Sequence, residues 1–179
     1  MALSKRKIRL FAFLLIALSL TTCADKANLD NLASDVEQKS EQQISSKNID
    51  NLDFTDYALS DESLRKIASW NQYNELNGYI EALKKANFDF FREEKSILKT
   101  LLDDSVANLP EQIKTKAVTA RIIAFQTSCY KLHGELEGNG QSKEATLTAI
   151  KEVLIAFANL NFQINKKFEK EGQNIQKPN

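Results

Sequence analysis

The chain has 179 residues, with 24 basic and 24 acidic side chains and a formal net charge of zero. Such a length fits one modest domain with a single hydrophobic core. Four of the basic residues and none of the acidic ones precede Leu10, so the rest of the chain has 24 acids against 20 basic residues, a net charge of −4. This acidic surplus argues against nucleic acid, and against an anionic membrane surface, as the partner.

The first 22 residues have the layout of a secretory signal. A basic stretch from Lys5 to Arg9 is followed by an uncharged run from Leu10 to Leu20, apolar except at Ser19, and then by two threonines. The run has eleven residues, whereas a membrane-spanning helix needs about 20. The sequence therefore predicts a cleaved signal peptide over 1–22.

The signal ends in Leu20-Thr21-Thr22-Cys23, which resembles the lipobox of bacterial lipoproteins. The resemblance implies that Cys23 becomes the first mature residue and carries the lipid. It also implies an envelope location with the outer membrane favoured, because Ala24, which is not acidic, follows the cysteine. The open alternative is cleavage after Ala24, which would remove Cys23 and release the protein.

Residues 23–59 are expected to form a lipidated, disordered acidic linker. Between Ala24 and Asp56 there are eight acidic residues against three lysines, and the apolar residues are scattered. A segment of this composition cannot bury enough apolar surface to offset the entropy lost on ordering.

Three helical patterns follow, in which apolar positions recur in steps of four and three. The first is expected to begin at the N-cap Ser60 and to run to Val106, with a break near Asn77-Gly78. Its stripe is Leu76, Ile80, Leu83, Asn87, Phe90, Glu94, Ile97 and Leu101. The second stripe, after a break at Pro110, is Val118, Ile122, Phe125, Cys129, Leu132 and Leu136. The third, after a turn at 138–140, is Leu147, Ile150, Leu154, Phe157, Asn161, Ile164 and Phe168.

These patterns predict an all-α fold over residues 60–172, an antiparallel three-helix bundle with an optional short fourth helix at its N-terminal end, followed by a disordered tail at 173–179. Four apolar residues lie outside the three stripes and form a candidate partner surface: Phe88, Ile123, Ile155 and Phe162. Large exposed apolar patches are rare on soluble monomers. Either residues 54–70 cover these positions or a partner does.

Three polar residues fall on the apolar stripes, namely Asn87, Glu94 and Asn161. Polar residues at such positions can fix the register of packed helices. The alternative is that they line a small polar pocket that accepts a ligand.

The remaining residues give no pattern of catalysis or cofactor binding. Cys129 and His133 share one helix face, but a metal site needs more ligands than this pair, and a buried thiol beside a boundary histidine is the favoured interpretation. Phosphate-binding loops and haem-attachment motifs are absent from the sequence. The expectation is therefore a protein without enzyme activity, metal or cofactor.

Two functions stay open. The first is a membrane-tethered helical interaction module of the bacterial cell envelope that binds an envelope protein or a second copy of itself. The second is a helical bundle that binds a small molecule or lipid. The general build is similar to small helical envelope lipoproteins, a likeness that assigns no functional residue.

Overall fold

The structure is a computed structural model that describes residues 43–138 and 142–173. The chain divides into two units, Met1–Gln43 and Ile44–Asn179, and only the second is described below. The predicted signal peptide, Cys23, most of the predicted linker and residues 174–179 lie outside the described residues.

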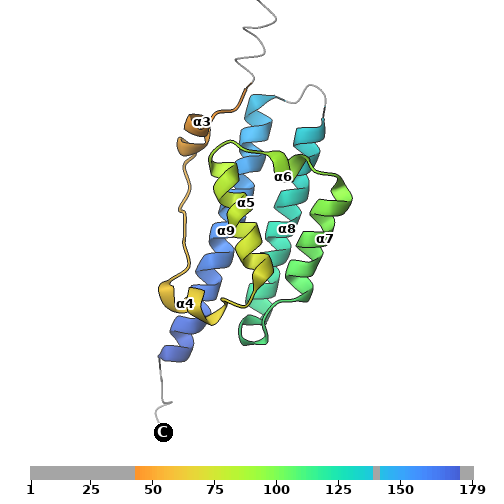
Figure 1. Cartoon of the computed structure of the whole chain (residues 1–179). Coiled ribbons are helices and arrows are strands. Elements are labelled where there is room, and N and C mark those ends of the chain that lie inside the picture. Colours follow the sequence, from red (N-terminus) through yellow and green to blue (C-terminus); the bar gives the residue numbers. More distant parts are fainter. Residues whose placement is uncertain (1–42, 139–141, 174–179) are drawn as a thin grey trace, which may run out of the picture. The chain divides into compact units, whose positions relative to one another are not determined.

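All regular elements of the described part are helical, which confirms the all-α class. Figure 1 shows how they are arranged. In chain order they are α3 (Ser46–Asp50), α4 (Asp61–Lys66), α5 (Asn71–Lys84), α6 (Asp89–Arg92), α7 (Lys95–Ala107), the 3₁₀ turn η2 (Glu111–Ile113), α8 (Lys116–Glu137) and α9 (Lys143–Gly172).

Helices α8 and α9 form a long hairpin that carries about half of the buried apolar side chains. Both begin at a capping hydroxyl: the Thr115 hydroxyl accepts from Val118 N at 3.2 Å, and the Ser142 hydroxyl accepts from Ala145 N at 3.1 Å. Their predicted stripes are buried, apart from the end positions Leu136 and Leu147, which are half-buried. The four-three spacing was therefore a reliable guide to the inward faces of these two helices.

The predicted first helix is interrupted, and the break lies after α5 rather than at Asn77-Gly78, which are inside α5. Ala86 adopts a left-handed conformation with φ of 60°. The backbone N–H groups of Ala86 and Asn87 bond back to Leu83 O at 2.9 Å and Ala82 O at 3.0 Å, which is the hydrogen-bond pattern that closes a helix at its C-terminus. The chain restarts as α6 and then α7.

This interruption changes the buried face of the second half. In α7 the buried side chains are Leu98, Leu102 and Ser105, whereas Ile97 is 52% exposed. The predicted stripe through Ile97 assumed an unbroken helix from α5, and the intervening turns reset the phase. As a result α5 and α7 are separate helices that lie beside α8 and α9 (Figure 1).

The folded unit begins at Ile44, not at Ser60 as the predicted boundary had it. Ile49 of α3 and Leu59 are buried, at 3% and 8% exposure. Residues 51–60, which we call the strap, connect α3 to α4 and run along α9 (Figure 1). Residues 44–59 thus belong to the folded unit: Ile49 and Leu59 are buried, and Ile44, Leu52 and Phe54 pack against the core.

Within the described residues, α9 is long and apolar enough to cross a membrane by length and composition alone. Half of the relevant window is buried inside the fold. A core helix passes the same test, and the packing of Phe157 against Phe125 of α8, with ring centroids 5.3 Å apart, is that of a core helix.

Candidate interaction surface

The four residues predicted to form a partner surface do not share one face. Phe88 is 7% exposed and belongs to the core, which corrects the prediction for this residue. It lies where the chain turns between α5 and α6, and Phe90 and Phe91 enter the core beside it. In one continuous helix over this stretch Phe88 would point outward, but α5 ends at Lys84 and the turn that follows directs Phe88 into the core.

The other three residues are exposed, at 46% for Ile123, 36% for Ile155 and 37% for Phe162. Ile123 is on α8, whereas Ile155 and Phe162 are on α9, two helical turns apart on one outward side. The ring of Phe162 contacts Tyr57 of the strap, with centroids 4.8 Å apart. The strap therefore covers part of Phe162, as expected if residues 54–70 shield the off-stripe apolar residues. It leaves Ile155 uncovered.

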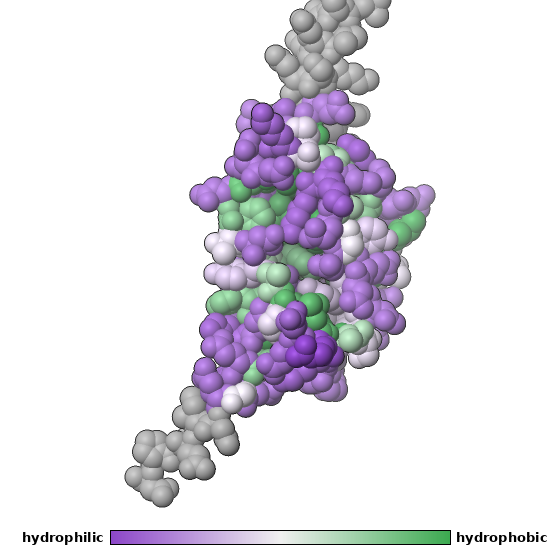
Figure 2. All heavy atoms as spheres, turned by 60° about the vertical axis from the view of Figure 1, so that its left-hand side comes forward, coloured by the Kyte–Doolittle hydropathy of each residue, from purple (hydrophilic) through white to green (hydrophobic). Residues whose placement is uncertain are grey.

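We call Tyr57, Ile155 and Phe162 the α9 patch. Figure 2 brings forward the side on which the strap runs, and apolar side chains are visible there between hydrophilic ones. Next to Ile155 is a hollow of about 270 Å³ between α8 and α9. Small and polar side chains line it together with Ile155: Arg121, Ala124, Ser128, Glu152, Ala156 and Asn159.

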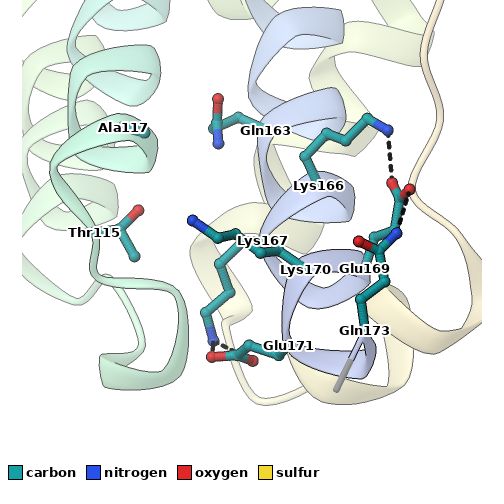
Figure 3. A pocket seen from close by; sticks show the side chains of 9 residues that line it. All are labelled: Thr115, Ala117, Gln163, Lys166, Lys167, Glu169, Lys170, Glu171 and Gln173. Carbon is teal, nitrogen blue, oxygen red and sulfur yellow. Dashed lines mark hydrogen bonds and ion pairs between the residues drawn. The ribbon is translucent and has the colours of Figure 1, made fainter. Parts of the chain in front are cut away.

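A larger hollow of about 720 Å³ lies between the start of α8 and the end of α9. In Figure 3 Thr115 and Ala117 stand on one side and the charged side chains of α9 on the other. Lys166 pairs with Glu169 at 2.7 Å and Lys167 with Glu171 at 2.8 Å. Most of this charge is neutralised along α9 itself, so the hollow has the character of a solvated helix surface.

The three polar stripe positions are not brought together. Asn87 and Glu94 are exposed, and they flank α6 in the connections beyond α5, whereas Asn161 is buried at 4% exposure. Asn161 bonds to Tyr73 near the start of α5, and Asn87 follows the end of that helix, about 20 Å away at 1.5 Å per residue. The predicted polar pocket is therefore not formed by these residues, because Asn161 lies near one end of α5 and Asn87 lies beyond the other end.

Asn161 instead holds the strap. Its Oδ1 accepts from the Tyr73 hydroxyl at 2.9 Å, and its Nδ2 donates to Tyr57 O at 2.9 Å. One turn later, Asn165 Nδ2 donates to Ala58 O at 2.9 Å, and Ser60 N donates to Asn165 Oδ1 at 3.0 Å. The pair satisfies strap backbone groups that have no sheet or helix partner.

Sequence reasoning missed Tyr73 and Asn165 in this arrangement. The signal that could have found it is the four-residue spacing of the two asparagines, which puts both amides on one side of α9. Burial raises the pKa of Tyr73 well above its ordinary value of 10, although the hydrogen bond to Asn161 acts in the opposite direction. The hydroxyl is therefore a permanent donor at neutral pH.

Cys129 and His133 are both buried in the core, where their contacts serve packing and helix attachment. The Cys129 thiol is fully buried, and burial raises its pKa well above the ordinary value of 9, so it stays protonated. His133 is 2% exposed, deeper than the boundary position expected; its Nδ1 bonds to Phe91 O at 3.0 Å. Its Nε2 lies 3.2 Å from Glu137 Oε2, too poorly aligned for a hydrogen bond but close enough for an ion pair when the ring is protonated. Histidine and backbone thus fasten α6 to α8.

Within residues 43–138 and 142–173, no group of three or more His, Cys, Asp and Glu side chains is placed to hold a metal ion. No protein-family model, curated protein or solved structure matches the chain. No residue role can therefore be transferred from a relative, and the functional argument depends on this molecule's own surface.

Proposed function

We propose that this protein is a lipid-anchored, non-enzymatic interaction module of the bacterial cell envelope, with the outer membrane as its favoured location. In this proposal Cys23 carries the anchor and the helical unit presents α9 to a protein partner. The expected antiparallel bundle is built around α8 and α9, and α5 and α7 together take the place of its first helix.

The observation that supports an interaction role is the α9 patch. The folded unit buries its core well, with many apolar side chains at or below 1% exposure, yet Ile155 and Phe162 on its longest helix stay more than one-third exposed. Single exposed apolar residues are ordinary. Here two exposed apolar residues lie on one side of one helix, next to a hollow and to the exposed ring of Tyr57. A partner that buried this surface would gain binding free energy from the apolar area removed from water.

The tether is tested by replacing Cys23 with serine in cells and comparing envelope and soluble fractions. The expected result is that wild-type protein is in the envelope fraction with the mass of an acylated Cys23, and that C23S is not. Wild-type protein that begins at Asp25, or C23S that still fractionates with membranes without detergent, would overturn the anchor.

The contact surface is tested with a photo-crosslinking amino acid placed at Ile155. The matched control is the same group at Ile97 of α7, which is more exposed, at 52%, and lies outside the α9 patch. Discrete protein adducts are expected from position 155 and not from position 97. Equal labelling from both positions would mean that α9 has no special role in binding.

A further inference from the structure

The outward side of α9 has a second heptad pattern, distinct from its core stripe. Its positions are Thr148, Glu152, Ile155, Asn159, Phe162 and Lys166, and they alternate in steps of four and three. All six lie at least partly exposed, while the core stripe of the same helix is buried. A seam of this spacing is the pattern by which one helix packs along another.

The order of side chains along this seam is self-complementary. Asn159 lies midway between the acidic Glu152 and the basic Lys166, seven residues from each, and Ile155 and Phe162 lie on either side of it within this stretch. If a second copy lies antiparallel, Ile155 faces Phe162 of the second copy, and Glu152 faces its Lys166, each twice. If it lies parallel, Glu152 faces Glu152 and Lys166 faces Lys166, which is repulsive. The charges therefore select the antiparallel arrangement.

We propose that α9 binds α9 of a second copy of this chain across a two-fold axis at Asn159. This inference deepens the proposed function, on which it rests for the role of the α9 patch, and it names the partner. The Asn159 amide makes no hydrogen bond within the described ranges. At a two-fold axis it meets its own copy, and two amides can donate to and accept from each other. A single polar residue in a seam fixes the register of such a pair.

Two further features of this surface favour binding of a second copy, the restricted Phe162 ring and the hollow beside Ile155. Phe162 is already held by Tyr57 on one side and lies 5.7 Å from Lys166 Nζ, so little side-chain freedom is left to lose on binding. The hollow beside Ile155 has alanines on both walls, Ala124 from α8 and Ala156 from α9. It is placed to receive the Phe162 ring of the second copy. A lipid tether would strengthen a weak pair by confining both copies to one surface.

Disulfide trapping in cells that express the full chain tests this geometry. Asn159→Cys brings two thiols together at the axis, whereas Thr148→Cys, eleven residues away, leaves its two thiols about 30 Å apart in the antiparallel pair. Because a disulfide forms only where the Cα atoms approach within about 7 Å, the N159C dimer after mild oxidation is expected to exceed the T148C dimer about ten-fold. Wild-type chain, which contains Cys23 and Cys129, gives the baseline.

A charge exchange keeps the test independent of any one substitution. In the N159C background, Glu152→Lys is expected to reduce the trapped dimer several-fold, as is Lys166→Glu. The two together are expected to restore it, because the cross-axis pairs are re-formed with reversed sign. Each single change also removes a pair within the chain, Lys131–Glu152 or Lys166–Glu169, and only a dimer contact explains recovery in the double variant.

The outcomes separate the two proposals. N159C protein that is in the envelope fraction and gives no dimer above wild type overturns self-association and leaves the tether intact. Equal trapping of N159C and T148C overturns the antiparallel arrangement. N159C protein that is soluble but still trapped as a dimer overturns the tether and supports the pair.

Discussion

The strap-facing side and the outward side of α9 both carry asparagine side chains, but these asparagines differ in their hydrogen-bond partners. On the strap side, Asn161 and Asn165 each make two hydrogen bonds to other parts of the chain. On the outward side, Asn159 makes none within the described residues, and Ile155 beside it is uncovered. The polar groups on the strap side bond to other parts of the chain. The outward side presents apolar and amide groups of the kind found in protein interfaces. The asparagines of the two sides cannot be told apart by residue type, but only by the segment of chain that packs against each.

Among substitutions on the two sides of α9, the largest loss of stability is expected when the Asn161 side chain is removed. Asn161→Ala leaves the Tyr73 hydroxyl and the Tyr57 carbonyl without their partner in a buried place, which is expected to lower the free energy of unfolding by about 2–3 kcal/mol. Urea denaturation measures the effect. Asn159→Ala is the matched control on the other side of the helix and is expected to change it by under about 0.5 kcal/mol. Equal losses would remove the distinction between the two sides.

Alkaline pH is expected to act through two buried groups, the Cys129 thiol of α8 and the Tyr73 hydroxyl of α5. Burial raises the pKa of Cys129 above its ordinary value of 9, so above that pH the unfolded chain loses a proton that the folded chain keeps. Unfolding is thereby favoured, and stability falls by about 1.4 kcal/mol per pH unit above 9 for this group. Tyr73 adds a similar loss above pH 10. Denaturation of wild type and C129A at pH 7 and pH 10 is expected to show the decline reduced in C129A; identical slopes would contradict the assignment.

Asn165 also bonds to the strap, but it is half-exposed, so its removal is expected to cost less stability than removal of Asn161. Asn165→Ala removes the acceptor of the Ser60 N–H and the donor to Ala58 O, and because water can replace both, the expected loss is about 1 kcal/mol. Hydrogen exchange provides a local measurement. The Ser60 amide is expected to exchange faster in the variant while amides in the middle of α8 keep their rates. Unchanged exchange at Ser60 would mean that Asn165 does not hold the strap.

The smallest effect on folding is expected at Ile155. Ile155→Ser removes an apolar side chain that is 36% exposed, at the margin of the core, so the free energy of unfolding should fall by about 0.5 kcal/mol or less. The measurement is urea denaturation at a concentration where the protein is a monomer. A loss as large as that of Asn161→Ala would mean that Ile155 serves the core and not a partner.

Parts of this fold could be read from the pattern of side chains because they depend on contacts that are local or repeated. The inward faces of α8 and α9 follow from the four-three spacing, and their starts follow from Thr115 and Ser142, whose hydroxyls cap the first turn. The break at Ala86 could not be foreseen in this way. An alanine is a good helix former, yet Ala86 adopts a left-handed conformation at the point where the chain turns towards the buried Phe88, Phe90 and Phe91.

The candidate surface was predictable only in part for a related reason. The off-stripe test correctly marked Ile123, Ile155 and Phe162 as outward, since each lies on a helix whose phase was known. It was wrong for Phe88, where no helix exists to define a phase. It also could not assign Asn161, because the partner of that amide, the strap, has the polar composition of a linker.

The sequence by itself determined the helical class and the inward faces of the two long helices, which follow from the 3.6-residue period and from short-range capping. Only the tertiary structure decided where the first helix breaks, that residues 44–59 are folded, and which asparagines are satisfied. Those outcomes depend on segments about a hundred residues apart in the chain meeting side by side, as Tyr57 and Asn161 do. No local pattern of side chains contains that information.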